Sequence, residues 1–388
     1  MSWILEGRPL SRVLVTRLRY LGDIVMSTVV LQALHRGDPD LKIDYLCEAA
    51  FGDVLEGQPE LDRLYRLGTG RRGSDARARG HQDGGDRAAR GAFGTVRDIR
   101  RRRPDLAVDL FFNPRSAWLL RLTGIRFRIG GTDRSRRHLY THAVLRSDPR
   151  CATPEFAALA QGGLGEHLCR LAPLQHGPTG QDFISWLTGE FTPGDLLPRL
   201  SERTRLPVAE DAMTRAGVDP QEPFLLLAPG ATWPTKEWPA ERWREFIPRC
   251  RERFGLPLAV VVPPGRSEEF RSLTDGLPPG AAALLDPVPL AAVLSLVSAS
   301  AGVVTVDGGL MHAAVGLGKP VVALFGPTDP SIWFPYGGDP RFQVLATRPE
   351  CHPCDLHRCD AFICLPDLQA PMVSEALAEV LDGRSSHA

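Results

Sequence analysis

Residues 302–312 read Gly302-Val303-Val304-Thr305-Val306-Asp307-Gly308-Gly309-Leu310-Met311-His312. The first five residues are mainly apolar and predict a buried strand, and the run from Met311 to Leu317 is compatible with a helix. A tight turn between a strand and a helix leaves backbone N–H groups unpaired, with the positive end of the helix dipole behind them. Such a turn is a ready anion site, and the paired glycines would let a ligand approach the backbone closely.

The anion that suits this turn is a phosphate, and Asp307 and His312 could add hydrogen bonds to a sugar or a diphosphate. The stretch therefore indicates a site for a sugar nucleotide. Many α/β proteins carry a glycine-rich turn of this kind without any ligand. A structural role, with His312 pinning the turn, therefore stays open from these residues alone.

Length and composition indicate a soluble protein with two domains. A chain of 388 residues exceeds what one hydrophobic core usually serves, and 43% hydrophobic with 24% charged residues is ordinary for a globular protein. No run approaches the roughly 18 uninterrupted apolar residues of a membrane span. The start, Met1 to Arg8, lacks the features of a secretory leader, so we expect a cytoplasmic protein.

Strand and helix patterns alternate in both halves of the chain. We expect strands at residues 13–18, 43–47 and 106–110, and again at 224–227, 258–262, 302–306 and 321–325. The runs in the second half are almost continuously apolar, as in parallel strands covered on both faces. The alternation predicts an α/β fold of two doubly wound parallel-sheet domains.

The domain boundary is expected near residue 205, giving domains of residues 1–205 and 206–388. Residues 69–90 are rich in Arg and Gly with almost no apolar side chains, so we expect a mobile loop there. No nucleic-acid partner is expected, because acidic residues are mixed in and no aromatic residues interleave. We expect a final helix at residues 372–381 to pack back on the N-terminal domain.

The two domains differ in charge although the whole chain is neutral. Residues 1–205 hold 32 basic and 24 acidic residues, and residues 206–388 hold 14 and 22. A basic first domain suits an anionic acceptor. Solvated charge, or attraction between the domains, would give the same numbers.

Unusual residues follow the expected strands directly. In doubly wound sheets, ligands bind beyond the carboxyl ends of the strands, so these loops are expected to line one cleft between the domains. The loops are at residues 21–23, 229–232, 264–267, 307–309 and 326–329.

Lysine usage points to one of these loops. Lys42, Lys236 and Lys319 are the only lysines, against 43 arginines. Lys236 lies in a loop directly after an apolar strand, where a compact ammonium can act as a point charge on a phosphate. Chance placement of one lysine in a loop is the alternative.

Three blocks of sequence occur in one order over nearly the whole chain: Arg17 to Thr28, Pro229 to Pro239, and Asp307 to Pro330. Together they resemble the bacterial heptosyltransferases of glycosyltransferase family 9. The resemblance implies a GT-B fold, in which two Rossmann-like domains face an interdomain cleft, the first binding mainly the acceptor and the second the nucleotide sugar. It implies heptose transfer from ADP-heptose to the lipopolysaccharide inner core, a lipid A–Kdo type of acceptor, with inversion at the anomeric carbon and no metal or other cofactor.

The resemblance also assigns roles to single residues. Asp23, which follows Gly22, matches the carboxylate proposed as general base, and a carboxylate after the first strand could take a proton from the acceptor hydroxyl. An N-cap Asp for a helix starting at Ile24 is the structural alternative. Lys236 matches the lysine that neutralises the leaving diphosphate, and Thr232 matches a hydroxyl near the same phosphates.

Asp307, Gly309 and His312 match a motif of the family that binds sugar and phosphate, written Asp, Thr or Ser, Gly, two residues, His. In this chain Gly308 stands where the family has the hydroxyl residue. The change removes a side-chain donor and leaves only the backbone N–H. Tightness of binding or sugar preference can therefore differ from that of the family's well-known members.

Eight cysteines fall into a cluster and a scattered set. The spacing C-x2-C-x4-C-x4-C in one segment could hold Zn²⁺ tetrahedrally, but the family's chemistry needs no metal, so thiols are favoured over a structural zinc site. The clustered residues are Cys351, Cys354, Cys359 and Cys364, and the scattered ones, expected to be packing residues, are Cys47, Cys151, Cys169 and Cys250. A disulfide is not expected to persist in a reducing compartment.

The sequence indicates the acceptor-binding residues less clearly than the donor-binding ones. A group of arginines, Arg126, Arg128, Arg134, Arg136 and Arg137, would suit an anionic glycolipid, although solvation of the surface explains them equally well. We expect a peripheral enzyme at the cytoplasmic face of the inner membrane, held by basic surface.

Two other functions remain open. One is a GT-B enzyme that uses another nucleotide sugar, either another glycosyltransferase or a sugar-nucleotide epimerase, which would release or convert sugar without an acceptor. The other is a non-catalytic sugar-nucleotide-binding protein, which would bind its ligand tightly and leave it unchanged. Retention of Asp23 and Lys236 argues against the second.

Overall fold

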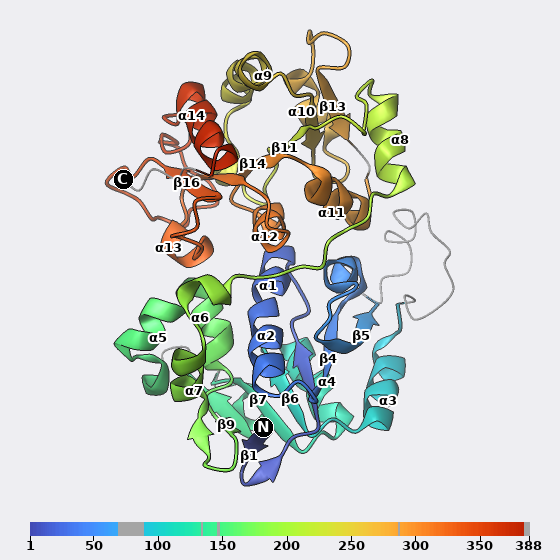
Figure 1. Cartoon of the computed structure of the whole chain (residues 1–388), viewed down its shortest axis with the longest axis vertical. Coiled ribbons are helices and arrows are strands. Elements are labelled where there is room, and N and C mark those ends of the chain that lie inside the picture. The colour runs from blue at the N-terminus through green and yellow to red at the C-terminus, as the bar shows by residue number, and fades with distance from the viewer. Residues whose placement is uncertain (69–88, 133–134, 146–147, 286–287, 384–388) are drawn as a thin grey trace. The chain divides into compact units, whose positions relative to one another are not determined.

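The computed structural model describes residues 1–388 except 69–88, 133–134, 146–147, 286–287 and 384–388 (Figure 1). The chain divides into two compact units, Met1–Ser201 and Glu202–Ala388, close to the boundary expected near residue 205. The loop expected at residues 69–90 lies outside the described residues except for Ala89 and Arg90. The backbone of Arg90 pairs with that of Leu67 beside the first sheet.

The first unit contains a six-stranded parallel sheet in the order β5-β4-β3-β6-β7-β8. Its strands are β3 (Arg12–Thr16), β4 (Lys42–Glu48), β5 (Leu61–Leu67), β6 (Leu106–Asp109), β7 (Phe127–Gly131) and β8 (His142–Val144). Its helices are α1 (Leu21–Met26), α2 (Thr28–Gly37), α3 (Ala92–Arg102), α4 (Pro114–Thr123), α5 (Pro154–Leu159), α6 (Gly162–Cys169) and α7 (Phe183–Glu190). The strand order changes direction beside β3, and ligands of doubly wound sheets bind at such a switch point.

A small antiparallel sheet, which the sequence did not predict, adds to this unit. It has the order β10-β9-β1-β2. Its strands are β1 (Trp3–Leu5), β2 (Arg8–Pro9), β9 (Gln175–His176) and β10 (Gln181–Asp182). These strands are too short to show a repeating pattern in the sequence.

The second unit repeats the architecture with the order β13-β12-β11-β14-β15-β16, again parallel throughout. Its strands are β11 (Leu225–Ala228), β12 (Leu258–Val261), β13 (Ala282–Leu285), β14 (Gly302–Val306), β15 (Val321–Phe325) and β16 (Phe342–Ala346). Its helices are α8 (Pro207–Arg215), α9 (Ala240–Phe254), α10 (Ser267–Phe270), α11 (Leu290–Ala299), α12 (Gly309–Gly316), α13 (Pro330–Trp333) and α14 (Ala370–Leu381). The prediction of two doubly wound parallel sheets is confirmed.

The expected strands at 302–306 and 321–325 coincide with β14 and β15, in which every residue is buried. Both strands therefore lie in the interior of a sheet covered on its two faces. Edge strands such as β5 and β16 were not predicted, because their burial is mixed and their sequences show no long apolar run.

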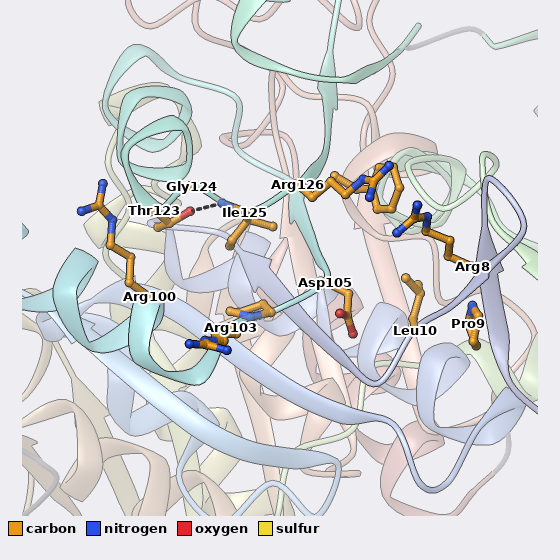
Figure 2. A pocket seen from close by; sticks show the side chains of 12 residues that line it. Arg8, Pro9, Leu10, Arg100, Arg103, Asp105, Thr123, Gly124, Ile125 and Arg126 are labelled. Carbon is orange, nitrogen blue, oxygen red and sulfur yellow. Dashed lines mark hydrogen bonds between the residues drawn. The ribbon is translucent and has the colours of Figure 1, made fainter.

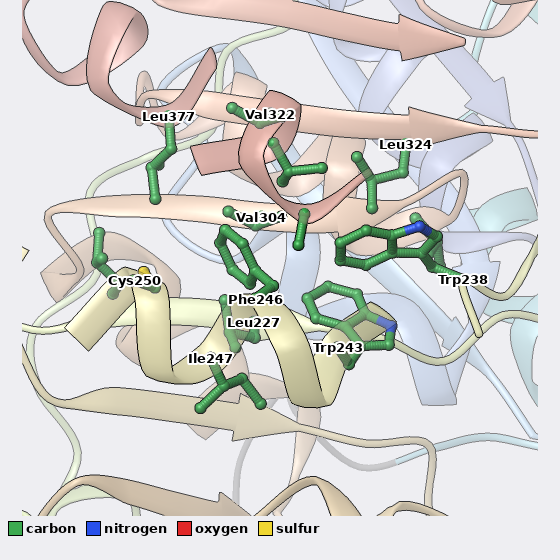
Figure 3. Packing of buried hydrophobic residues seen from close by; sticks show 14 of the residues in the cluster. Leu227, Trp238, Trp243, Phe246, Ile247, Cys250, Val304, Val322, Leu324 and Leu377 are labelled. Atoms are coloured by element: carbon green, nitrogen blue, oxygen red, sulfur yellow. The ribbon is translucent and has the colours of Figure 1, made fainter. Parts of the chain in front are cut away.

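Aromatic side chains of α9 and its preceding loop fill the core of the second unit (Figure 3). Trp238 and Trp243 meet edge to face with ring centroids 5.0 Å apart, and Phe246 lies 6.0 Å from Trp243. Each of these side chains is at most 2% exposed. Large buried rings in offset contact stabilise a core beyond their apolar area alone.

The final helix, α14, joins this same core. Val373, Leu377 and Val380 are buried in the cluster that contains α9 and the strands of the sheet. The apolar side of α14 is therefore buried in the core of the second unit.

The four scattered cysteines occur in two structural situations. Cys47 and Cys250 are fully buried, as expected for packing residues. Cys151 and Cys169 were also expected to be packing residues, and this was wrong, because a disulfide joins them with their Cα atoms 6.0 Å apart. The chain separation of 18 residues gave no sign that α6 brings Cys169 back to the turn at Cys151.

Candidate active site

Three loops of the second unit meet because they follow neighbouring parallel strands, β11, β14 and β15. Lys236 comes from the loop after β11, Asp307 follows β14, and Thr328 follows β15. The Lys236 Nζ lies 2.7 Å from Asp307 Oδ2, and the Thr328 hydroxyl donates to the same oxygen at 2.6 Å. The structure thus brings together the predicted Lys236 and Asp307 and adds Thr328, which sequence reasoning did not single out.

Aromatic rings surround the ammonium of Lys236. Its Nζ lies 4.3 Å from the centre of the Trp233 ring and 6.0 Å from that of Trp333. The lysine side chain is 12% exposed and the Asp307 side chain 5% exposed. A cation held against a carboxylate and ring faces in a largely dry setting is positioned before any ligand arrives.

A second ion pair braces the loop that carries Lys236. Arg266 binds Glu237 at 2.6 Å, and Glu237 accepts the backbone N–H of Ala231 at 2.8 Å. Arg266 donates hydrogen bonds to the carboxylates of Glu237 and Glu269, which raises the pKa of its guanidinium. Thr232 lies in the braced loop with an exposed side chain, and it makes no hydrogen bond to the rest of the described chain. It is therefore available to a ligand.

The glycine turn begins helix α12 with no side-chain cap. Gly308 is the N-cap residue, and no side chain accepts the first N–H groups of the helix. Its φ is −169°, which any residue adopts, and an added Cβ would meet only the Val306 carbonyl oxygen at 3.8 Å. The fold therefore does not require glycine at this position. The N–H groups at the start of α12 carry no side-chain cap, as the prediction of an anion site requires.

His312 lies on α12 with its side chain 3% exposed. Its Nδ1 is 2.5 Å from the hydroxyl of Tyr336, which is itself buried. This contact fixes the imidazole ring. It supports the structural role for His312 that the sequence left open. Tyr336 lies 24 residues further along the chain, which hid it from sequence reasoning.

In the first unit Asp23 lies in the first turn of α1, beside buried Gly22. The N-cap residue is Tyr20, whose N–H donates to Asp23 Oδ2 at 3.2 Å, so the alternative of an N-cap Asp for a helix starting at Ile24 was wrong. Arg17 binds Asp23 Oδ1 at 2.5 Å. Burial raises the pKa of Asp23, but the charge and hydrogen bonds of Arg17 outweigh it, and the net pKa lies below the ordinary value.

Arg17 is itself fixed from three directions. One guanidinium nitrogen donates to the Leu110 carbonyl at 2.6 Å, another contacts Asp23, and the group lies 4.8 Å from the centre of the Phe111 ring. The arrangement holds the Asp23 carboxylate ionised and in one orientation. The sequence contained Arg17 in a matching block but gave no sign of this contact.

The arginines expected on the acceptor side do not form one patch among the described residues. Arg126 lines a cavity at the start of β7, whereas Arg136 follows the end of β7 and donates to the Phe112 carbonyl at 3.0 Å. Arg128 donates to the Leu139 carbonyl at 2.8 Å. Arginines that are close in sequence thus lie at opposite ends of β7.

The cysteine-rich segment lies against the loops that hold Lys236 and Thr328. His357 stacks on Trp233 with ring centroids 3.7 Å apart, and the Thr235 hydroxyl donates to the Leu356 carbonyl at 2.6 Å. The backbone N–H of Cys354 donates to the Pro327 carbonyl at 3.0 Å. Within the described residues, no three His, Cys, Asp or Glu side chains are grouped to hold a metal ion.

Two solved glycosyltransferase structures share the fold of this chain. The ADP-heptose lipopolysaccharide heptosyltransferase II of Escherichia coli matches with a TM-score of 0.69 and 19% identity, over 95% of this chain and 98% of that one. A family 9 glycosyltransferase of Veillonella parvula matches with a TM-score of 0.70 and 18% identity, over 96% and 97%. The two parallel sheets thus define a GT-B fold.

Sequence comparison narrows this class. Residues 196–361 match the family described as glycosyltransferase family 9 (heptosyltransferase). Lipopolysaccharide heptosyltransferase 1 of Pseudomonas aeruginosa is 27% identical over 90% of this chain and 87% of its own length. Lipopolysaccharide heptosyltransferase 3 of Escherichia coli is 23% identical over 83% and 85%. The family match over residues 196–361 and the relatives over most of the chain length identify the protein as a glycosyltransferase.

Proposed function

We propose that the protein transfers a heptose from ADP-heptose to the inner core of lipopolysaccharide, with inversion at the anomeric carbon. The observation that carries the donor side is the Lys236–Asp307 pair, held 2.7 Å apart beside the uncapped start of α12. A cation and free backbone N–H groups at one strand edge suit a diphosphate. Relatives over most of the chain length are lipopolysaccharide heptosyltransferases.

The leaving diphosphate gains negative charge as the bond between the anomeric carbon and its phosphate oxygen breaks. Lys236 would stabilise that charge, with the N–H groups at Gly308 and Gly309 and the exposed hydroxyl of Thr232 adding hydrogen bonds. Because Trp233 and Asp307 already hold the ammonium in place, little reorganisation is needed when the charge develops.

Asp23 would act as the general base. The acceptor hydroxyl attacks the anomeric carbon from the face opposite the leaving ADP, and its proton passes to the Asp23 carboxylate. The contact with Arg17 keeps that carboxylate ionised at neutral pH. Asp307 and His312 would hold the sugar, since the carboxylate accepts hydrogen bonds from hydroxyls. We further propose that no metal takes part, because the lysine and the helix start supply the positive charge.

The acceptor in this proposal is an anionic glycolipid, so the enzyme would act peripherally at the cytoplasmic face of the membrane. No helix in the described residues has the length and apolar composition to cross a bilayer. Contact with the membrane would therefore come from the protein surface.

The test is a calorimetric titration with ADP, UDP and GDP, followed by a transfer assay with ADP-heptose and a lipid A–Kdo acceptor. We expect selective binding of ADP and transfer of heptose. Asp23→Asn should keep ADP affinity and lose transfer. Preference for UDP or GDP would move the protein to another sugar, and hydrolysis or epimerisation without transfer would refute the proposed reaction.

A further inference from the structure

A basic surface with apolar side chains lies on the first unit, formed by the exposed sides of α3 and α4 and by the adjoining amino-terminal edge of the sheet. We refer to it as the α3–α4 face. It carries none of the residues proposed for catalysis. The carboxyl ends of the strands, where Asp23 follows β3, are at the opposite edge.

One side of α3 combines a phenylalanine with arginines. Phe93, Arg97 and Arg101 are four residues apart and so project from the same side of the helix. Phe93 is 90% exposed, which is high for a phenylalanine. Next to it, between α3 and α4, runs a groove of about 720 Å³ whose apolar wall includes Leu119 and Leu122.

A second cavity of about 520 Å³ continues from this groove (Figure 2). Arg100 and Arg103 line both cavities. Arg8 on β2 and Arg126, which directly precedes β7, line the second one. Asp105 is the one acidic residue that lines it within the described chain, and its Oδ2 already accepts the N–H groups of Ser11 and Arg12 at 2.7 and 3.0 Å. The cavity therefore keeps a net positive charge.

Two arginines of the α3–α4 face are held in defined positions by the fold. Arg100 donates to the Leu122 carbonyl at 2.6 and 3.0 Å, which fixes the spacing of α3 and α4. Arg103 ends α3 with φ +52°, in the left-handed region where glycine is ordinarily favoured after a helix. An arginine thus stands where the backbone conformation favours glycine.

We propose that the α3–α4 face binds the anionic surface of a phospholipid bilayer. Guanidinium groups match lipid phosphates, and Phe93 and Leu122 are placed to enter the interfacial layer beside them. A folded nucleic acid or an acidic protein would match the arginines but would leave the exposed Phe93 and the apolar groove unused. The inference rests on the proposed function, which brings the enzyme to a membrane, and adds which surface of the first unit makes the contact.

The test is sedimentation of the full chain with vesicles of phosphatidylcholine alone or with added phosphatidylglycerol. We expect binding only to the anionic vesicles, weakened by salt. The double variant Arg97→Glu/Arg101→Glu should lower the partition coefficient by at least about tenfold. The matched control is Arg244→Glu/Arg249→Glu on α9, where the same charge change falls on side chains 48% and 52% exposed. This control should change binding by less than about twofold.

A third variant separates binding from folding. Arg103→Gly removes a charge while giving the backbone its preferred residue, so it should weaken vesicle binding without lowering the Tm. ADP affinity, measured on every variant, should stay at the wild-type value and reports on the donor site separately. No binding to anionic vesicles at low salt, equal loss in the α9 control, or a dimer that the double variant dissociates would each overturn the proposal.

Discussion

Removal of the Lys236 ammonium tests the donor site most directly. The Nζ lies against Asp307 and the Trp233 ring, and the side chain is only 12% exposed. A hydrogen bond to a charged group contributes about 1.5–3 kcal/mol. Lys236→Ala should therefore weaken ADP binding by roughly tenfold to a hundredfold. The loss in kcat should be larger than the rise in KM, because the charge on the leaving diphosphate grows towards the transition state.

The same variant also changes stability. It leaves the Asp307 carboxylate, 5% exposed, with the Thr328 hydroxyl but without a counter-charge. Removing one partner of a fully buried ion pair lowers the free energy of unfolding by about 3–5 kcal/mol. Because Lys236 is partly accessible to solvent, we expect a loss of about 1–3 kcal/mol for Lys236→Ala. Adding Asp307→Asn removes the stranded charge, so the double variant should regain stability in urea unfolding. It should not regain ADP affinity.

Calorimetric titration with ADP decides the outcome, and Lys319→Ala is the matched control. Lys319 precedes β15 at the amino end of the strand and donates to the Ser298 carbonyl at 3.0 Å. Its removal should leave ADP affinity unchanged. If Lys236→Ala binds ADP within twofold of wild type while folded, or if both lysine variants lose affinity equally, the placement of the diphosphate at Lys236 is refuted.

Three further predictions concern the turn at Gly308, the ionisation of Asp23 and the absence of a metal from the reaction. Gly308→Ser should raise the free energy of unfolding by a few tenths of a kcal/mol through an N-cap hydrogen bond, and a lower Tm would contradict the open space at this position. Because Arg17 holds the pKa of Asp23 below its usual range against the effect of burial, wild-type kcat/KM should fall only as pH drops through that low pKa. In Arg17→Met only the effect of burial on the Asp23 pKa remains, so the fall of kcat/KM on the acid side should move to higher pH. An unchanged pH profile would show that Arg17 does not lower the pKa of Asp23. Dialysis against EDTA should leave ADP affinity and heptose transfer unchanged. If EDTA abolishes transfer and added metal ions restore it, the proposal of metal-free transfer is refuted.

The parts of the fold that the sequence predicted are those where one physical signal dominates. β14 and β15 are buried on both faces, so every position is apolar or small and the pattern is unambiguous. The small sheet formed by β1, β2, β9 and β10 has strands of two or three residues, which leave no period to detect. The disulfide between Cys151 and Cys169 depends on how α6 packs, which residue spacing does not determine.

The same distinction holds for the site. Lys236 and Asp307 could be predicted because each lies in a loop that follows a readable strand, and the ends of neighbouring parallel strands converge. Glu237 and Arg266 could not, because their ion pair joins loops after β11 and β12 without any local pattern. Position 308 shows the limit of motif matching, since the structure has room for the hydroxyl residue that the family carries.

The two carboxylate oxygens of Asp307 explain how one residue can serve both the lysine and a sugar. Lys236 and Thr328 both bind Oδ2, and no other described residue donates a hydrogen bond to Oδ1. The pair of donors on one oxygen fixes the carboxylate plane and leaves the second oxygen for a ligand hydroxyl. Asp307→Ala, which removes this acceptor, should therefore weaken the binding of a nucleotide sugar more than that of the nucleotide alone. Because Thr328 holds Asp307 in this way, it belongs with the motif residues in the proposed donor site.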